Sequence, residues 1–393
     1  MISNQLDNFN ISEHYKEFSV TERTLLTGHS HQAWPDRAQL GLQEAWRDAT
    51  ASVDDKWGKA FKKADKLKQF YAQLLGDSSH ENYVLAQNTH DLLVRFLSAL
   101  NWRKRKRIVT TDGEFHSMRR QLHRLEEEGV EIIRVPVSPF DSLCERMNAQ
   151  ITENTTAVML SAVMFKNAVI IPHLALLGET TTEKSIPLLV DVYHALNVLP
   201  FDVKANGLDN AYLVGGGYKY CQFGEGNCFL RIPAQCDLRP IVTGWYAEFG
   251  ELEQTPDLNR TQYPRGGDRF QGSTYDPISH YRACAVIDFF EEKELKPNFL
   301  RTLSQHQIGI LRMGFDELNC DKKLISRADV PLESIAGFFS LRTNQAASIQ
   351  QALKQKDIWT DQRDGFLRFG PAPYLSDLQL KDAILALGEL IVS

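Results

Sequence analysis

Two residues near the middle of the chain have the chemistry of a site for a pyridine aldehyde. Asp191 ends the apolar run Pro187-Leu-Leu-Val-Asp191, and Lys219 follows a second such run in Gly215-Gly-Gly-Tyr-Lys219. A lysine at a strand end can form a Schiff base with an aldehyde, and an aspartate at a neighbouring strand end can keep a pyridine nitrogen protonated. This pair predicts pyridoxal phosphate (PLP) as the cofactor, with Lys219 and Asp191 as catalytic residues.

Each residue of the pair also has a simpler interpretation. Lys219 could be a solvated lysine in a glycine-rich turn, and Asp191 could be the N-cap of a helix that follows a strand. A carboxylate at the end of an aliphatic run is costly unless it meets a cation or hydrogen-bond donors. His194, three residues after Asp191, could be a packed histidine or a hydrogen-bond donor to the phenolic oxygen of the cofactor.

A third segment could hold the cofactor phosphate. Ala86-Gln-Asn-Thr-His-Asp-Leu92 lies between an expected strand and an expected helix. Backbone N–H groups and a hydroxyl at a helix N-terminus bind phosphate well. Thr89 and His90 are the candidate contacts, with Asn88 as a further one, although Asn88 or Thr89 could simply cap the helix.

The amino-acid composition is typical of a soluble globular protein. The 393 residues are 43% hydrophobic and 24% charged, with a formal net charge of -6, so neither nucleic acid nor an anionic membrane is an expected partner. The six cysteines have no CxxC or CxxH spacing, which predicts no metal site and no disulfide framework. Without a signal-like N-terminus or an apolar run of 18 residues, we expect a cytoplasmic protein.

The order of apolar runs predicts an α/β fold. Runs without polar alternation are typical of strands that are buried on both faces, so they favour a mainly parallel sheet covered by helices. They fall at residues 82–86, 107–111, 131–135, 157–161, 187–191 and 211–215. We expect a large PLP-binding domain over residues 56–290, a small α+β domain over 291–393, and an N-terminal segment, 1–55, that joins the small one.

The motifs resemble those of the class V aminotransferase group of fold-type I PLP enzymes. Asp-x-x-His is followed by Gly-x-Gly-Tyr-Lys-Tyr, and then by a Gly-x-Gly-x-x-Phe-Leu segment. Within that group the chain is most similar to kynureninase, because Tyr218-Lys219-Tyr220 and Gly244-Trp245 match its segments. The resemblance implies a seven-stranded-type, mainly parallel sheet flanked by helices, plus a smaller α+β lobe.

The resemblance also implies further cofactor contacts. Tyr218 and Trp245 would reach the phosphate, and Tyr218 would also be catalytic by relaying a proton to the substrate. Either Phe115 or His116, in Asp112-Gly-Glu-Phe-His-Ser117, would stack on the pyridine ring, depending on the register. Ser273 or Thr274 would contact the phosphate of a neighbouring subunit, which implies a homodimer with shared active sites.

On the substrate side, the resemblance assigns Arg368 to the α-carboxylate of an amino acid. Leu367-Arg-Phe-Gly-Pro-Ala-Pro-Tyr374 is similar to a kynureninase segment, and a planar guanidinium suits bidentate binding of a carboxylate. The expected reaction is kynureninase-like hydrolysis of a Cβ–Cγ bond, which converts kynurenine or 3-hydroxykynurenine to an anthranilate-type acid and alanine.

The chain departs from kynureninase around the substrate. His29-Ser-His-Gln32 replaces Asn-Ser-Leu-Gly, so His29 and Ser30 are the candidate contacts there, and Phe165 stands where the family has a tyrosine. A class V aminotransferase or a β-lyase acting on another amino acid is therefore the alternative. A cysteine desulfurase lacks support because residues 368–374 contain no cysteine. A non-catalytic PLP-binding sensor is the remaining reading.

Overall fold

The structure is a computed structural model that describes residues 6, 9–251 and 259–392. A seven-stranded sheet forms the centre of a large lobe, in the order β2-β8-β7-β6-β5-β3-β4. Its strands are β2 (Tyr83–Ala86), β3 (Arg107–Thr111), β4 (Glu131–Val135), β5 (Thr155–Ser161), β6 (Leu188–Asp191), β7 (Tyr212–Gly216) and β8 (Cys228–Arg231). β8 is antiparallel to both of its neighbours, and the other pairings are parallel. The predicted α/β class and the seven-stranded, mainly parallel sheet are confirmed.

Helices cover both faces of this sheet. Their bounds are α2 (Ala38–Ser52), α3 (Lys56–Leu74), α4 (Thr89–Ser98), α5 (His116–Glu127), α6 (Leu143–Asn148), α7 (Leu174–Glu183) and α8 (Ile278–Glu292). All seven residues of β5 are buried, and successive side chains enter different cores. Val158 and Leu160 belong to a core cluster that includes residues of α3, α6, α7 and α8, whereas Ala157 and Met159 belong to a second cluster with residues of α4 and α5. This alternation explains why the strands read as continuous apolar runs.

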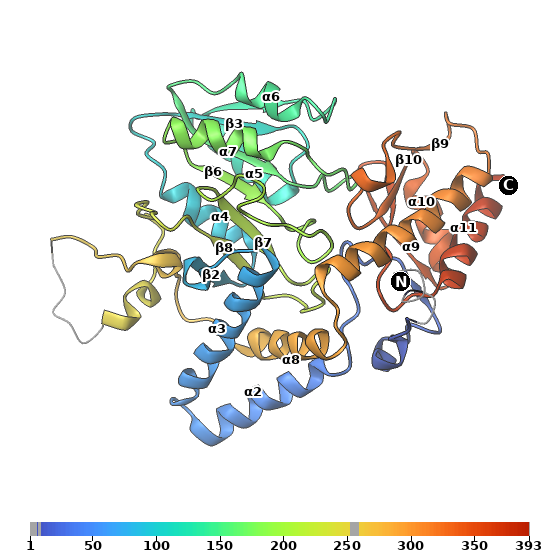
Figure 1. The fold of residues 1–393 in the computed structure, drawn as a ribbon, viewed down its shortest axis with the longest axis horizontal. Helices are drawn as coiled ribbons and strands as arrows, with labels where there is room; N and C mark the ends of the chain where they lie inside the picture. The colour runs from blue at the N-terminus through green and yellow to red at the C-terminus, as the bar shows by residue number, and fades with distance from the viewer. Residues whose placement is uncertain (1–5, 7–8, 252–258, 393) are drawn as a thin grey trace.

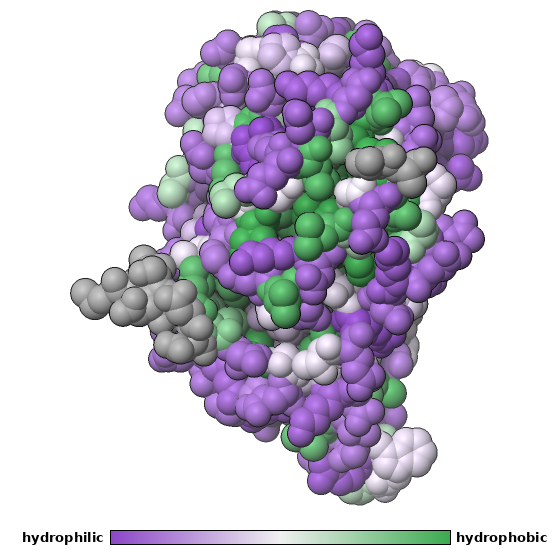
Figure 2. Space-filling model, turned by 90° about the vertical axis from the view of Figure 1, so that its right-hand side faces the viewer, coloured by the Kyte–Doolittle hydropathy of each residue, from purple (hydrophilic) through white to green (hydrophobic). Residues whose placement is uncertain are grey.

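The small lobe contains a four-stranded antiparallel sheet and three helices, which lie together in Figure 1. Its elements are α9 (Pro297–Glu317), β9 (Ile325–Arg327), β10 (Phe339–Thr343), α10 (Ala346–Lys354), β12 (Asp361–Arg363), β13 (Phe366–Phe369) and α11 (Asp377–Val392). The sheet order is β12-β13-β10-β9. Most of the face on this side of the molecule is hydrophilic, and hydrophobic residues gather toward its middle (Figure 2).

The N-terminal segment touches both lobes. Strand β1 (Thr24–Leu25) pairs in parallel with β11 (Ile358–Trp359) of the small lobe. Helix α2 lies along α8 (Figure 1), so closely that a Cβ atom on Gly41 would be 2.4 Å from the carbonyl oxygen of Tyr281. The division at residues 55 and 290 stays a prediction.

Short 3-10 helices complete the connections: η1 (Ser12–His14), η2 (Lys16–Phe18), η3 (His80–Asn82), η4 (Trp245–Glu251), η5 (Gly266–Phe270) and η6 (Leu332–Ser334). Within the described part of the chain, none of the helices combines the length and the apolar character that crossing a membrane requires.

Candidate cofactor site

Asp191 and Lys219 meet in one cavity of about 320 Å³ at the carboxyl ends of β6 and β7. In open α/β sheets this end of the strands is where ligands bind. Eight of the residues expected from the sequence line the cavity: Asn88, Thr89, Phe115, Phe165, Asp191, His194, Tyr218 and Lys219. Segments far apart in the sequence therefore converge on one chamber.

Lys219 is buried, with 6% of its surface exposed. Its Nζ atom lies 2.7 Å from Nε2 of His194 and 4.7 Å from the ring centre of Tyr193. Burial lowers the pKa of Lys219 to about 7; the charge of Asp191 opposes the shift and that of Arg368 adds to it. The amine is thus close to neutral at ordinary pH, as a nucleophilic lysine requires.

The close approach of the lysine loop depends on glycine. A Cβ atom on Gly217 would lie 2.2 Å from the ring of Phe223 and 2.8 Å from the hydroxyl of Tyr71. Tyr71 belongs to α3, and its hydroxyl donates to the carbonyl oxygen of Asn227 at 2.6 Å. The run of glycines before Lys219 therefore lets the loop pack directly on aromatic side chains.

Asp191 ends β6, and its Oδ1 atom accepts a hydrogen bond from the backbone N–H of Tyr193 at 2.8 Å. Desolvation raises the pKa of Asp191, while that hydrogen bond and the charge of Lys219 pull it down. His194 lies within the same chamber, and burial lowers its pKa well below the usual range. A cation in the chamber would relieve the desolvated aspartate.

Glu114 is a neighbouring residue that the sequence reasoning did not single out. Its carboxylate accepts hydrogen bonds from the hydroxyls of Thr111 (2.5 Å) and Ser161 (2.6 Å) and from the backbone N–H of Ser161 (3.2 Å). Burial, with the nearby charge of Asp191, raises the pKa of Glu114 to about 7, although its hydrogen bonds oppose the shift. Its position beside Phe115 in the stacking segment was the available signal.

Two of the three residues expected to contact the phosphate line the cavity. Asn88 caps α4, because its Oδ1 atom accepts from the N–H of Asp91 at 2.9 Å. Asn88 and Thr89 line the cavity, whereas His90 is exposed and lines a neighbouring surface groove. The helix N-terminus thus faces the cavity, and the His90 side chain does not.

The stacking candidates separate in the structure. Phe115 lines the cavity, with its ring centre 5.6 Å from Nζ of Lys219. His116 begins α5 and lies in the surface groove, where its Nδ1 atom is 3.0 Å from Nη2 of Arg119. The geometry thus favours Phe115 over His116 as the ring that would cover the cofactor.

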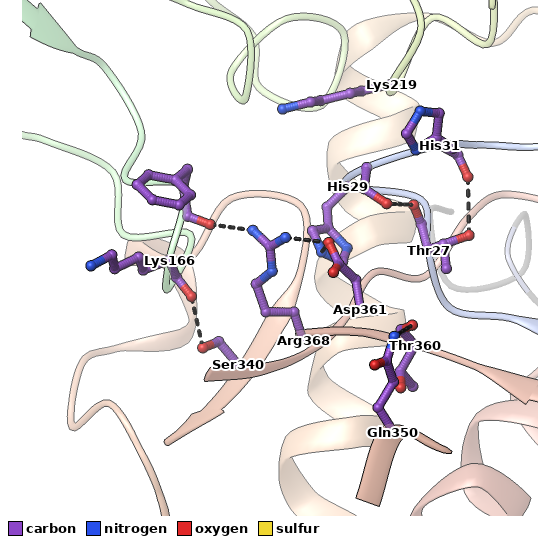
Figure 3. Close-up of polar contacts among 12 residues, drawn as sticks. Thr27, His29, His31, Lys166, Lys219, Ser340, Gln350, Thr360, Asp361 and Arg368 are labelled. Carbon is purple, nitrogen blue, oxygen red and sulfur yellow. Dashed lines mark hydrogen bonds and ion pairs between the residues drawn. The ribbon is translucent and has the colours of Figure 1, made fainter. Parts of the chain in front are cut away.

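On the substrate side, Arg368 is buried and already paired (Figure 3). Its Nη1 atom donates to the carbonyl oxygen of Phe165 at 2.6 Å, and its Nη2 atom forms a very short ion pair with Asp361. The Nε atom of Arg368 is buried and has no hydrogen-bond partner among residues 6, 9–251 and 259–392. Asp361 was missed in the sequence, since a single acidic residue in a short strand gives no signal of its own.

His29 lies beside this pair and is fully buried. Its Nε2 atom is 3.6 Å from Oδ2 of Asp361, too long for a strong hydrogen bond. Burial and the charge of Arg368 lower the pKa of His29 to about 3, so the imidazole is neutral. Ser30 donates to the carbonyl oxygen of Thr27 at 3.2 Å and lies outside the residues that line the cavity.

The remaining candidates lie away from the cavity of this chain. Trp245, 43% exposed, donates from Nε1 to Oγ1 of Thr274 at 3.3 Å. Ser273 is also exposed. These three residues share an outer surface rather than the chamber around Lys219, and within one chain they do not contribute to it.

The fold and the site agree with one family. Residues 41–359, most of the chain, match the family described as Aminotransferase class-V. The chain therefore belongs to the class V aminotransferase family, and with it the predicted PLP dependence and the fold-type I transferase fold are confirmed.

The relatives of this chain have different names. The chain is 22% identical over 387 residues to the uncharacterized aminotransferase YcbU of Bacillus subtilis, covering 95% of this chain and 96% of that protein. It is 24% identical over 190 residues to the cysteine desulfurase IscS of Rickettsia rickettsii, covering 47% of this chain and 46% of that protein. A solved structure of mutant C-DES with glycine covalently linked to the PLP cofactor superposes with a TM-score of 0.82 at 15% identity, covering 96% and 99% of the two chains.

Proposed function

We propose that this protein is a PLP-dependent enzyme that acts on an amino acid as an aminotransferase or a β-lyase. The observation that carries this proposal is the convergence of Lys219 and Asp191 in one cavity at the ends of neighbouring strands. Membership of the class V aminotransferase family supports it, as does similarity to proteins named aminotransferase and cysteine desulfurase.

The residues around the cavity fit PLP. Asp191 offers a carboxylate to a protonated ring nitrogen, and Phe115 offers an aromatic face. The buried Nδ1 atom of His194 has no hydrogen-bond partner in the described part of the chain, so a polar ligand group would satisfy it. Thr89 begins α4, where backbone N–H groups and the helix dipole favour a phosphate dianion. Bound PLP would supply an electron sink for the negative charge that develops at the substrate Cα atom.

Lys219 would move the proton of the reaction. With a pKa of about 7, its Nζ atom is neutral often enough to accept the Cα proton and to return it elsewhere on the substrate. Asp191 would hold the proton on the ring nitrogen. Arg368 would bind the α-carboxylate, which requires that the substrate displace Asp361 or the Phe165 carbonyl from the guanidinium fork.

Kynureninase-like hydrolysis of a Cβ–Cγ bond is the second candidate. The rings of Phe115 and Phe165 line the cavity with their centres 5.4 Å apart, in an edge-to-face arrangement that would accept an aromatic side chain. Tyr218 lines the same cavity, and burial raises its pKa. Its hydroxyl therefore stays protonated and would be available to donate to a side-chain carbonyl.

Cysteine desulfurization has less support because it needs a thiolate nucleophile. Cys228 is the cysteine that lines the cavity, and its Sγ atom lies 3.7 Å from the hydroxyl of Tyr193. Burial raises the pKa of Cys228 to about 12, so the thiol stays protonated at ordinary pH. This residue therefore suits a wall of the chamber better than a nucleophile.

The active unit in this proposal is a homodimer with shared sites. Trp245, Ser273 and Thr274 are exposed and lie away from this chain's own cavity, as expected for residues that complete the site of a second copy. Sedimentation of the purified protein, with and without the Trp245→Ala substitution, would test the dimer.

The proposed function is tested by cofactor capture and turnover. The purified protein should be yellow with PLP, and borohydride should fix the cofactor to Lys219. Lys219→Ala should lose this attachment, whereas Lys63→Ala should retain it. Lys63 lies on α3, and its Nζ atom binds Glu44 at 2.8 Å. A Lys219→Ala protein that still traps cofactor on reduction contradicts the proposal.

Products then separate the candidate reactions. A keto acid with pyridoxamine phosphate indicates an aminotransferase, pyruvate with ammonia indicates a β-lyase, and anthranilate-type fluorescence from kynurenine or 3-hydroxykynurenine indicates the second candidate. A protein that changes its absorbance with amino acids but forms no product would instead be a PLP-binding sensor.

A further inference from the structure

Five polar residues from both lobes meet at the outer side of the cavity. His116 and Arg119 come from the first turn of α5, Lys166 follows Phe165 after β5, and Arg363 and Asp364 end β12 and begin the turn to β13. We call these five residues the entrance cluster. Nζ of Lys166 binds Oδ2 of Asp364 at 2.9 Å, and Nη2 of Arg119 lies 3.0 Å from Nδ1 of His116.

Phe165 connects this cluster to the cavity. The Phe165 ring lines the cavity, its centre is 5.5 Å from that of the His116 ring, and Nζ of Lys166 lies 5.7 Å from it. Ser117, next to His116, lines both the cavity and the outer groove. The side chain of Lys166 points away from Arg368 (Figure 3), so the cluster lies beyond the α-carboxylate site rather than within it.

The cluster carries excess positive charge. Around His116 lie three cations, Arg119, Lys166 and Arg363, and one carboxylate, Asp364. The charge of Arg363 also lowers the pKa of Asp361. His116 adds no charge at neutral pH, because burial and the charge of Arg119 lower its pKa. Arg363 is exposed at the end of β12, and its guanidinium has no hydrogen-bond or ion-pair partner among the residues that the structure describes.

Arg368, in contrast, has an ion-pair partner. Asp361 already offsets the charge of Arg368, so the interior pair is close to neutral while the entrance is positive. A substrate with a carboxylate at each end would therefore find Arg368 beside the chamber and excess positive charge at the entrance cluster.

We propose that the entrance cluster is a subsite for a second anionic group, and that the preferred substrate is an amino acid with an acidic side chain. This inference rests on the proposed function, because it assigns the side-chain end of the same substrate. Arg119 and Arg363 would bind the distal carboxylate by charge-assisted hydrogen bonds, and Phe165 would contact the carbon chain between the two carboxylates.

Matched substrate pairs test the subsite. We expect kcat/KM to be higher for glutamate than for glutamine, and for aspartate than for asparagine, by about tenfold. Arg119→Ala and Arg363→Ala should each reduce that preference by about two- to fivefold. Arg119→Lys should restore part of it, and high salt should weaken it.

Arg124→Ala is the matched control. Arg124 lies on the same helix and pairs with Glu127 and Glu128, so its loss changes the net charge equally at a distance from the cavity. The acid preference should survive this substitution. Equal kcat/KM for acidic and neutral partners in the wild-type holoenzyme overturns the subsite.

A binding measurement separates this inference from the proposed function. Glutarate and butyrate differ by one carboxylate and cannot react, so calorimetry on the holoenzyme measures the subsite without turnover. We expect glutarate to bind more tightly, and Arg363→Ala to remove the difference. If no amino acid is turned over but glutarate still binds selectively, the proposed function fails and the subsite stands; equal binding of both acids overturns the subsite.

Discussion

The Nζ atom of Lys219 lies 2.7 Å from the Nε2 atom of His194 inside the cavity. Burial lowers the pKa of both groups, and each cation would repel the other. The His194 imidazole is therefore neutral near pH 7, whereas Lys219 populates both the ammonium and the neutral amine, and the neutral fraction is the nucleophile.

This pair makes cofactor capture dependent on pH. Because the pKa of Lys219 is about 7, the rate at which the apoprotein attaches PLP should rise with pH and level off above about pH 7. Asp191→Asn removes the charge that favours the protonated amine, so it should move the midpoint to lower pH. Stopped-flow absorbance over pH 5–9 would check this, and a midpoint near that of free lysine would contradict it.

Glu114 predicts a second dependence on pH, in the stability of the apoprotein. Its pKa is about 7 in the folded state against an ordinary value of 4.5. Below pH 4.5 both states hold the proton, but as pH rises toward 7 the unfolded state alone releases it. The free energy of unfolding should therefore fall, by about 3 kcal/mol once the folded group also ionises.

Glu114→Gln isolates this contribution, because it keeps the shape but cannot titrate. Urea unfolding between pH 4 and 8 gives the free energy of unfolding of each protein. The difference between wild type and variant removes the opposing effect of buried histidines such as His280. The difference should show the loss described above. Parallel curves for the two proteins would refute the assignment.

Much of the fold was predictable because apolar runs report burial on both faces of a sheet. Residues 107–111 and 131–135 form strands with the expected bounds. β8 was not predicted as a strand, since Cys228–Arg231 is short and follows a glycine-rich loop. β8 is also antiparallel to both of its neighbours, and the sequence of so short a strand does not indicate its direction.

The part of the candidate site that could be predicted consists of residues that directly follow a strand. Asp191, Lys219 and Thr89 were predicted from strand-to-loop boundaries in the chain, and all three line the cavity. Phe115 was predicted from the family resemblance, as an alternative to His116. Asp361 and the entrance cluster could not be predicted, because they depend on how β12 approaches Phe165 from the other lobe. Such pairings are long-range contacts, which local sequence patterns do not encode.

The buried pair of Arg368 and Asp361 predicts strong energetic coupling. Either Arg368→Ala or Asp361→Ala leaves a desolvated charge without its partner and should lower the free energy of unfolding by about 3–5 kcal/mol. The double variant should lose much less than the sum. Urea unfolding of the four proteins measures this coupling.

An exposed ion pair provides the matched control for that cycle. Nζ of Lys356 binds Glu389 at 2.7 Å, with side chains 45% and 67% exposed. Because water screens this pair, its coupling should be below about 1 kcal/mol. Similar coupling energies in the two cycles would show that burial of the Arg368 pair contributes nothing.

Gly337 supports the lysine loop from the small lobe, and its replacement should distort that loop. A Cβ atom there would lie 2.5 Å from the ring of Tyr220, which directly follows Lys219. Tyr220 is buried and rigid, so Gly337→Ala should lower the free energy of unfolding by about 1–3 kcal/mol and slow PLP attachment. Gly58→Ala is the control: on α3, a Cβ atom at Gly58 meets nothing within 4 Å, so this helix should gain up to about 1 kcal/mol. Urea unfolding and the rate of PLP capture measure both variants, and a Gly337→Ala protein with wild-type values for both would contradict the packing described.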